Sequence, residues 1–374
     1  MDRGLIIAKI RLTKLKLFSY RNYSDASFDF DSSCIILHGA NGCGKTNLLE
    51  AISLLSPGRG LRRATYKQMC AIGGNDNFVI NASLANQDYG EVNIGTGLRP
   101  ASARRQVHIN SQAVLIDELT QYCRISWLTP LMDKLFIGPY SDRRRFLDRL
   151  VLSITPRHGA AVRDYEKLML ARNYTLQEPS LDEAALDSYE ANMARLAVII
   201  AQARNNFVTK LAETLARMSD QLAIKAALSI KGEIEAQLLR YKAEDAEANM
   251  QQLLHDSRMQ DRAMGRCSTG THRSDFCIKH AEKNMSAELC SSGEQKALLL
   301  NLILAQAELT KQISGMAPIL LFDELVAYLD IVNKTSFLAK LQGYEGQIII
   351  TATDNNLLGD LQTNAQLFDI SQIQ

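Results

Sequence analysis

The sequence of 374 residues lacks several features by which large classes of proteins are recognised. Its seven cysteines form no C-x-x-C pair and are odd in number, which argues against a disulfide framework and against a zinc site. No apolar run approaches the roughly 18 residues of a membrane span, and the chain becomes charged at Lys9, too early for the apolar region of a signal peptide. We therefore expect a cytoplasmic protein with no membrane segment.

A strong overall charge is also missing. The net charge of +1 gives no global attraction to nucleic acid or to acidic lipid, so such a partner has to be held by a local patch. Residues 1–67 carry eleven Lys and Arg against five Asp and Glu, and residues 140–172 carry eight against four. Since 46% of the residues are hydrophobic and 22% are charged, we expect a packed globular protein whose positive surface lies in these two regions.

Hydrophobic periodicity changes twice along the chain. Residues 6–110 alternate in the manner of strands, and residues 106–114 are typical of a hairpin that turns at Asn110. Helical spacing begins near Tyr140, and one long helix is expected from about 182 to 219. An apolar helix and an apolar strand then indicate a return to a buried α/β core. These changes divide the chain into residues 1–130, a mainly helical insertion at 131–277, and residues 278–374.

The most specific motif is a phosphate-binding loop. Residues 39–46 match G-x-x-x-x-G-K-[ST] between an apolar strand at 34–38 and a helical segment at 47–55. Glycines let backbone N–H groups surround phosphates, and the helix N-terminus adds partial positive charge. Lys45 is expected to reach the β- and γ-phosphates and Thr46 to bind Mg²⁺. The predicted nucleotide-binding residues are Gly39, Ala40, Asn41, Gly42, Cys43, Gly44, Lys45 and Thr46.

Two carboxylates follow the apolar strand at 319–322. Asp323 is expected to hold Mg²⁺ through water, and Glu324, one residue further, to act as the general base toward the attacking water. Standing alone, an acidic pair at the end of a strand is more often a solvated turn. The phosphate-binding loop changes this interpretation, because the carboxyl ends of parallel strands meet at one edge of a sheet.

A third motif begins the helix that follows residue 290. Either Ser291 or Ser292 can cap this helix, and Glu294 favours its first turn. By itself, the segment predicts only a well-capped helix. Together with Gly293 and Gln295 it also offers a second anion-binding surface, built from a hydroxyl, a glycine backbone and a helix N-terminus.

In this order, the three motifs and the later Asp330 resemble the Walker A, signature, Walker B and D-loop motifs of ABC ATPases. In that class, the signature of one subunit completes the γ-phosphate site of its partner. The resemblance therefore implies two ATP molecules with Mg²⁺ held between two copies of the chain. It also implies an α/β fold, namely an ABC-type P-loop ATPase head with a mixed sheet, an antiparallel β layer and an inserted, mainly helical second lobe.

Further blocks of sequence occur at residues 19–23, 56–62, 127–133, 143–150 and 270–275. They resemble the RecF family of bacterial recombination mediators, within the SMC-like class of ATPases, and they span nearly the whole chain. The chain departs from the family pattern at Thr271, where Pro is usual. It also has no His at 350–354 to sense the γ-phosphate, which makes Thr353 or Asp354 the substitute, and it shows no clear Q-loop glutamine.

The resemblance implies a weak, DNA-stimulated ATPase that acts in DNA replication, DNA repair and the SOS response. Such a protein dimerises with ATP on double-stranded DNA and at junctions of single and double strands, and it helps to load recombinase at gaps. RecR is the partner implied by the resemblance, with RecO and RecA in the same pathway. The alternative is another SMC-like head that acts as a nucleotide-gated scaffold. Glu324 argues against a pure nucleotide sensor, and the absence of a C-x-x-C hook argues against a long SMC-type arm.

Basic residues supply candidates for DNA contacts. Arginines of this kind are as often solvated or paired within a helix as they are bound to phosphate. His272 and Arg273 either pack inside the lobe or sense nucleotide, and Trp127 is expected in the core. The DNA-contact candidates are Lys14, Lys16, Arg21, Arg59, Arg62, Arg63, Arg104, Arg105, Arg143, Arg144 and Arg145.

Overall fold

The computed structural model describes residues 10–86, 90–218, 222, 224–324, 334–353 and 364–372. These residues form two compact units. Unit 1 consists of the described parts of residues 1–133, 221–223 and 291–374, and unit 2 of those of 134–220 and 224–290. The predicted boundary at 277 lies within strand β10 (Asp275–His280), which pairs with β9 (Ala226–Lys231) inside unit 2.

A five-stranded parallel sheet lies at the centre of unit 1, in the order β14-β3-β13-β12-β8. Every residue of β12 and β13 is buried, which explains why their sequences are apolar without alternation. Trp127, on β8, is 6% exposed, so its predicted place in the core is confirmed. The bounds are β3 Cys34–His38, β8 Ile125–Leu128, β12 Ile319–Phe322, β13 Ile348–Ala352 and β14 Gln366–Asp369.

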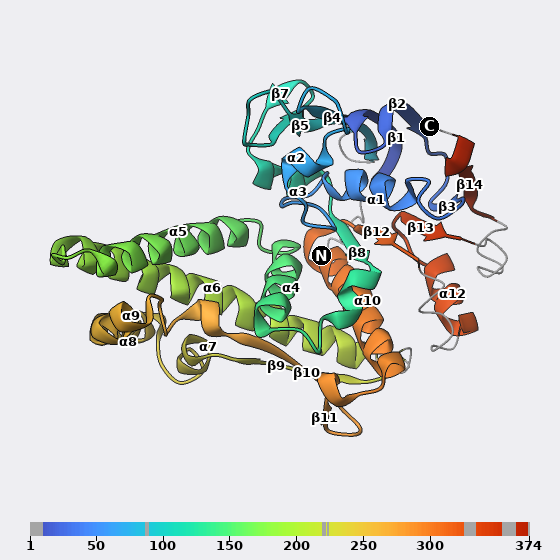
Figure 1. The fold of residues 1–374 in the computed structure, drawn as a ribbon. Coiled ribbons are helices and arrows are strands. Elements are labelled where there is room, and N and C mark those ends of the chain that lie inside the picture. Colours follow the sequence, from blue (N-terminus) through green and yellow to red (C-terminus); the bar gives the residue numbers. More distant parts are fainter. Residues whose placement is uncertain are drawn as a thin grey trace, which may run out of the picture. The chain divides into compact units, whose positions relative to one another are not determined.

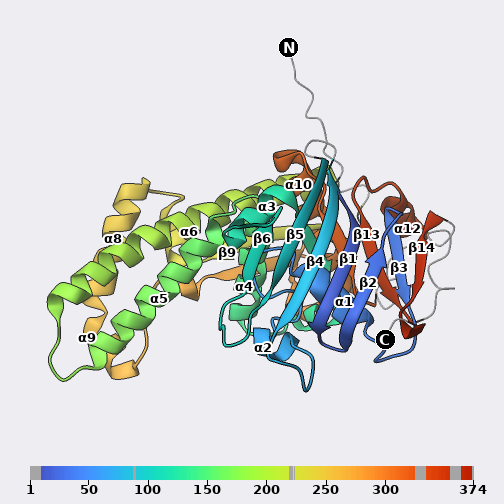
Figure 2. The ribbon, with the colours of Figure 1, turned by 90° about the horizontal axis from the view of Figure 1, so that it is seen from above.

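A six-stranded antiparallel layer packs on the same core, in the order β2-β1-β4-β5-β6-β7 (Figure 2). Buried and more exposed residues alternate along its strands, because one face covers the core and the other meets solvent. The predicted hairpin is confirmed: β6 and β7 pair across Asn110 and Ser111, which both have positive φ. The bounds are β1 Ile10–Tyr20, β2 Tyr23–Asp29, β4 Phe78–Asn86, β5 Gly90–Leu98, β6 Gln106–Ile109 and β7 Gln112–Ala113.

The helices of unit 1 include α1, which begins at Lys45 within the phosphate-binding motif, and α10, which contains the predicted apolar stretch. Helix α10 ends at Ser314 and is capped by Gly315, whose φ of 70° is the left-handed conformation that commonly stops a helix. The bounds are α1 Lys45–Ser53, α2 Tyr66–Met69, α3 Leu119–Tyr122, α10 Ser292–Ser314 and α12 Lys334–Gln342.

Unit 2 is mainly helical, and α5 lies along α6 (Figure 1). Helix α6 (Glu183–Arg217) confirms the predicted long helix, and Asp182 caps it by accepting a hydrogen bond from the Ala185 N–H. A three-stranded sheet, β11-β10-β9, completes the unit. The remaining bounds are α4 Tyr140–Leu152, α5 His158–Gln177, α7 Glu233–Gln237, α8 Ala243–Asp256, α9 Arg258–Met264 and β11 Met285–Ser286.

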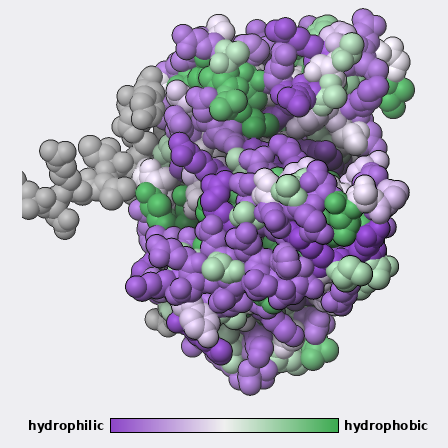
Figure 3. All heavy atoms as spheres, turned by 90° about the vertical axis from the view of Figure 1, so that its left-hand side faces the viewer, coloured by the Kyte–Doolittle hydropathy of each residue, from purple (hydrophilic) through white to green (hydrophobic). Residues whose placement is uncertain are grey.

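The molecular face in Figure 3 is mostly hydrophilic, with hydrophobic side chains in small groups. None of the helices in the described part of the chain combines the length and the hydropathy needed to cross a bilayer.

Candidate functional site

The phosphate-binding loop occupies the carboxyl end of β3 and leads into α1. Gly39, Gly42 and Gly44 have φ angles of 138°, 83° and 107°, which residues with a Cβ rarely adopt. At Gly44 the space is closed as well, because a Cβ would lie 2.6 Å from Asn22 Nδ2 and 2.8 Å from Tyr23 Oη. Glycine is therefore required at the third glycine position of the motif for two reasons: the backbone conformation and the close approach to the β1–β2 turn.

Lys45 is the first residue of α1 and is only 7% exposed. Its Nζ donates hydrogen bonds to the carbonyl oxygens of Gly39, at 2.6 Å, and Ala40, at 2.8 Å. The ammonium group thus lies inside the loop, where the motif needs it. Asn41 and Gly42 are exposed at the outer side of the loop, whereas Cys43 is buried beneath it.

The parallel sheet brings the loop and the carboxylates together. Thr46 Oγ1 donates a hydrogen bond of 2.9 Å to Asp323 Oδ1, across 277 positions of sequence. Asp323 is 7% exposed, and its N–H continues the strand pairing by donating to the Leu128 carbonyl. Glu324 is exposed and has a φ of 52°, an uncommon conformation for a residue with a side chain.

Thr351, at the end of β13, belongs to the same cluster, although sequence analysis did not single it out. Its hydroxyl donates to Asp323 Oδ1 at 2.8 Å and accepts from the Glu324 N–H at 2.8 Å. The only sequence signal was the apolar strand itself, whose carboxyl end lies at the same edge of the parallel sheet. Of the two proposed γ-phosphate sensors, Thr353 is exposed and Asp354 lies outside the described residues.

A polar network ties two of the family-like blocks to α1. Arg21, a candidate DNA contact in the β1–β2 turn, forms a two-pronged ion pair with the fully buried Glu50 instead, with both N–O distances at 2.8 Å. Asn47 donates to Asn22 Oδ1 at 2.6 Å and accepts from Arg62 at 2.5 Å. Residues 19–23 and 56–62 thus touch the helix that carries Lys45 and Thr46.

The start of α10 settles which serine caps it. Ser291 Oγ accepts from the Glu294 N–H, and the Glu294 carboxylate accepts from the Ser291 N–H at 2.9 Å, which is a complete capping box. Ser292 is therefore the first helical residue, and it is exposed. Gly293 is half-buried and Gln295 buried. Asp330 lies outside the described residues.

The candidate DNA contacts separate by burial. Arg59, Arg63 and Arg104 are exposed, whereas Arg62 donates a hydrogen bond to Asn47. Arg105 is a correction: it is 8% exposed and donates to the carbonyl oxygens of Leu54, Ser56 and Gly58, so it holds the chain after α1 instead of facing solvent.

Arg143 is a second correction. Its guanidinium pairs with Asp275 at 2.8 and 2.9 Å and donates to two carbonyl groups of the preceding loop. Arg144 is half-buried and donates to the Ser274 carbonyl at 3.0 Å. These two arginines thus join the family-like blocks at 143–150 and 270–275 inside unit 2, because both guanidinium groups are engaged by protein acceptors.

The same two blocks meet again at Arg204 of α6. This guanidinium is 2% exposed, pairs with both carboxylate oxygens of Asp148, and donates to Thr271 Oγ1 at 2.6 Å. Burial alone would raise the pKa of Asp148, but Arg204 and the hydrogen bond with His158 hold that pKa well below its ordinary value. The cluster is therefore a buried, charged part of the core of unit 2.

His272 packs within unit 2. Its ring nitrogens lie 3.2 Å from Tyr165 Oη and 3.2 Å from the Cys267 carbonyl oxygen. Burial lowers the pKa of His272 to about 4, so the ring is neutral at pH 7. Of the two roles considered for His272, packing inside the lobe is the one its contacts favour.

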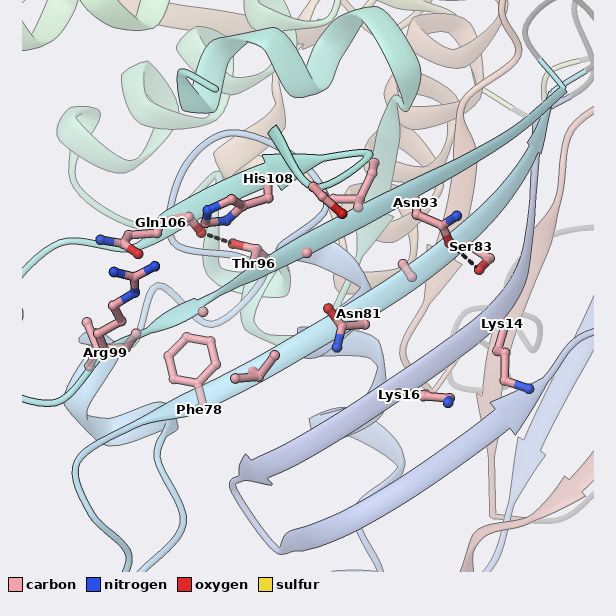
Figure 4. A pocket seen from close by; sticks show the side chains of 17 residues that line it. Lys14, Lys16, Phe78, Asn81, Ser83, Asn93, Thr96, Arg99, Gln106 and His108 are labelled. Atoms are coloured by element: carbon pink, nitrogen blue, oxygen red, sulfur yellow. Dashed lines mark hydrogen bonds between the residues drawn. The ribbon is translucent and has the colours of Figure 1, made fainter. Parts of the chain in front are cut away.

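A groove of about 640 Å³ lies on the solvent face of the antiparallel layer (Figure 4). Lys16, Asn81, Gly95 and His108 follow one another across four strands in a single row of its floor. Lys14 also lines the groove but pairs with Asp29 of β2 at 2.9 Å. The groove shares no lining residue with the phosphate-binding loop, so it is a separate surface of unit 1.

Comparisons with known proteins agree with this geometry. The family described as "RecF/RecN/SMC N terminal domain" matches residues 11–373. "DNA replication and repair protein RecF" from Brucella suis is 44% identical over 365 residues, covering 97% of this chain and 95% of that protein. The protein of the same description from Agrobacterium fabrum is 44% identical over 368 residues, covering 97% of each.

Solved structures show the same fold. A RecF structure described with ATP, in the RecFOR pathway, has a TM-score of 0.87 at 22% identity and covers 100% of this chain and 99% of that one. An Smc head domain from Pyrococcus furiosus has a TM-score of 0.51 at 16% identity, covering 96% of this chain and 94% of that one. The predicted α/β head with parallel and antiparallel sheets and a helical lobe is confirmed, and the chain belongs to the RecF family of DNA replication and repair proteins.

Proposed function

We propose that this protein is an ATP-dependent DNA-binding protein of recombinational repair, which dimerises around two ATP molecules and hydrolyses them slowly. The observation that carries the proposal is the hydrogen bond between Thr46 and Asp323, because it joins the phosphate-binding loop to the end of β12. Support also comes from the 44% identical relatives in DNA replication and repair and from the similar fold described with ATP.

The residues at this edge suit a magnesium nucleotide. Mg²⁺ prefers oxygen ligands and usually takes one or two from the protein, with waters and phosphate oxygens completing its shell. The Thr46 hydroxyl and the Asp323 carboxylate are such ligands, and the ion would neutralise phosphate charge. No cluster of three or more His, Cys, Asp or Glu among the described residues forms a metal site by itself, which fits an ion that arrives with its nucleotide. Lys45 binds the β- and γ-phosphates, and Glu324 accepts the proton of the attacking water.

The segment Ser291–Gln295 completes the site from a second copy of the chain. The capping box engages the Ser291 side chain and leaves Ser292 exposed at the helix N-terminus. That terminus attracts anions through its N–H groups and its partial positive charge. Two copies in opposite orientation would each present this surface to the γ-phosphate bound by the other, with Asp330 as the D-loop residue.

DNA is bound by the closed dimer through its phosphates. Arg59, Arg63 and Arg104 of unit 1 remain the candidates, because they are exposed. The similar RecF structure belongs to the RecFOR pathway, so RecR is the expected partner and RecO and RecA act nearby. Loading of recombinase at single-strand gaps is the role we assign to the complex.

Glu324→Gln tests this function. The substitution removes the base and keeps the shape, so the variant should accumulate as an ATP-bound dimer, with twice the protomer mass in light scattering after size exclusion. The same dimer should retain gapped duplex DNA only with ATP, and retention should weaken steeply as salt rises. A variant that stays monomeric with ATP and Mg²⁺ contradicts the proposal.

The matched control is Ser292→Arg in the Glu324→Gln background. An arginine at this exposed position should block the approach of the partner and abolish the dimer, while ATP binding by the monomer persists. Loss of ATP binding by the monomer would instead place Ser292 in the chain's own nucleotide site.

A further inference from the structure

One buried hydroxyl links both carboxylates of the candidate ATPase site. Thr351 is fully buried at the carboxyl end of β13, next in register to Asp323, since Ile350 pairs with Phe322. Its hydroxyl hydrogen is donated to Asp323 Oδ1, and its lone pair accepts the Glu324 N–H, both at 2.8 Å. A hydroxyl group has one hydrogen to donate. Here that hydrogen is donated to the Asp323 carboxylate, while the hydroxyl oxygen accepts the hydrogen bond from the Glu324 backbone.

The first bond fixes the orientation of Asp323. Its Oδ1 accepts two hydroxyl groups, from Thr46 on α1 and from Thr351 on β13. Two donors from different elements hold a carboxylate more firmly than one, because each restricts its rotation about a different direction. Thr46 has a second task in the proposed site as a ligand of the nucleotide-bound ion, whereas Thr351 can serve orientation alone.

The second bond fixes the backbone of Glu324. A φ of 52° is unfavourable for a residue with a Cβ and persists where the surroundings hold it. The Glu324 side chain is exposed, so its direction depends on this backbone conformation. The Thr351 hydroxyl is the acceptor of its N–H.

We propose that Thr351 is a positioning residue for ATP hydrolysis, which sets Asp323 for the Mg²⁺ ion and Glu324 for the attacking water through a single hydroxyl group. The inference rests on the proposed function. It assigns to β13 a role in hydrolysis that needs no histidine at residues 350–354.

Thr351→Val and Thr351→Ser separate the hydroxyl from the shape of the side chain. Valine fills the same volume with neither donor nor acceptor, whereas serine keeps both. In single-turnover hydrolysis at saturating Mg²⁺, we expect Thr351→Val to be roughly tenfold to a hundredfold slower, the effect of a small misplacement of catalytic groups. Thr351→Ser should stay within about threefold of the wild type. Thr351→Val should also need more Mg²⁺ for half-maximal binding of a fluorescent ATP analogue.

Two comparisons exclude a merely structural effect. Thr96 is a buried threonine of the antiparallel layer that donates to the Gln106 carbonyl and accepts from Arg105, so Thr96→Val removes a buried hydroxyl whose bonds to these two residues involve neither carboxylate of the site. It should lower the thermal midpoint as Thr351→Val does but leave hydrolysis unchanged. The second comparison is the double variant Glu324→Gln, Thr351→Val. At saturating Mg²⁺ its residual rate of hydrolysis should equal that of Glu324→Gln alone, because the carboxylate base that Thr351 positions is already missing.

The outcomes are distinct. Wild-type rates and wild-type Mg²⁺ dependence in Thr351→Val overturn the inference, as does an equal loss of activity in Thr96→Val. A wild-type protein that binds ATP without hydrolysing it overturns the proposed hydrolysis, and the Mg²⁺ dependence of analogue binding then decides the role of Thr351 toward Asp323.

Discussion

Replacement of Arg204 by methionine should destabilise unit 2 strongly. Methionine retains the length of the aliphatic stem and removes the guanidinium, which in the wild type contacts Asp148, Thr271 and Glu235 from a position 2% exposed. Two carboxylates then stay inside the unit without their cation: Glu235 is 1% exposed and keeps a hydrogen bond from Ser274, and Asp148 keeps its contact with His158.

The magnitude follows from the cost of an unpaired buried charge. Removal of one partner from a buried ion pair costs about 3–5 kcal/mol, because the remaining charge is no longer compensated. With a urea dependence of about 2 kcal/mol per M, this corresponds to a midpoint lower by about 1.5–2.5 M. Adding Asp148→Asn and Glu235→Gln should restore part of the loss, since it removes the uncompensated charges and leaves neutral hydrogen-bonding groups.

The single tryptophan makes the assay specific for each unit. Trp127 belongs to unit 1, so its fluorescence follows unit 1, while far-UV circular dichroism is dominated by helices, many of them in unit 2. Arg204→Met should shift the dichroism transition more than the fluorescence transition. The control is Lys167→Met, which breaks the exposed pair with Asp164 and should cost less than about 1 kcal/mol. Equal midpoints for the two variants would refute a central role for Arg204.

Two further predictions concern His272 and Gly44. The pKa of His272 is about 4 in the folded protein against 6.5 unfolded, so stability is complete above pH 6.5 and falls by about 3 kcal/mol as the pH drops toward 4. His272→Gln should flatten this part of the pH dependence in urea titrations followed by dichroism, and an unchanged slope would show that other groups carry it. Gly44→Ala should weaken ATP binding at least tenfold in equilibrium dialysis, because the added Cβ meets Asn22 and Tyr23 at a φ of 107°, and normal binding would contradict the geometry.

Sequence patterns were sufficient to predict the bounds of elements that form because they bury apolar side chains. The strand at 34–38 is predicted to the residue, and the long helix differs from the prediction by one residue at its start and two at its end. The contact between Thr46 and Asp323 could also be foreseen, because both residues follow the carboxyl ends of parallel strands. The serine that caps α10 was left open, although the Ser-x-x-Glu spacing of a capping box favours Ser291 over Ser292.

Sequence patterns could not predict the hydrogen-bond partners of polar side chains where the partner lies far away in the sequence. Arg143 looks the same in sequence whether it faces DNA or pairs with Asp275, which lies 132 positions away. Thr351 lies one residue before the end of an apolar strand and has no motif of its own, so its two hydrogen bonds appear only when β12 and β13 are placed side by side. A hydrophobic period reports which face of an element is buried, but it does not report which acceptor a guanidinium or a hydroxyl group reaches.

This distinction determines which arginines belong in a test of DNA binding. Arg143 and Arg204 pair with the partly buried carboxylates of Asp275 and Asp148, and moving either arginine onto a phosphate would leave a carboxylate of unit 2 without its cation. Their substitution would impair DNA binding only by damaging the fold, and would give a misleading result. The exposed Arg59 and Arg104 carry no such structural cost. Their replacement should reduce the salt dependence of DNA binding by about one counterion per lost phosphate contact and leave the unfolding transitions in place.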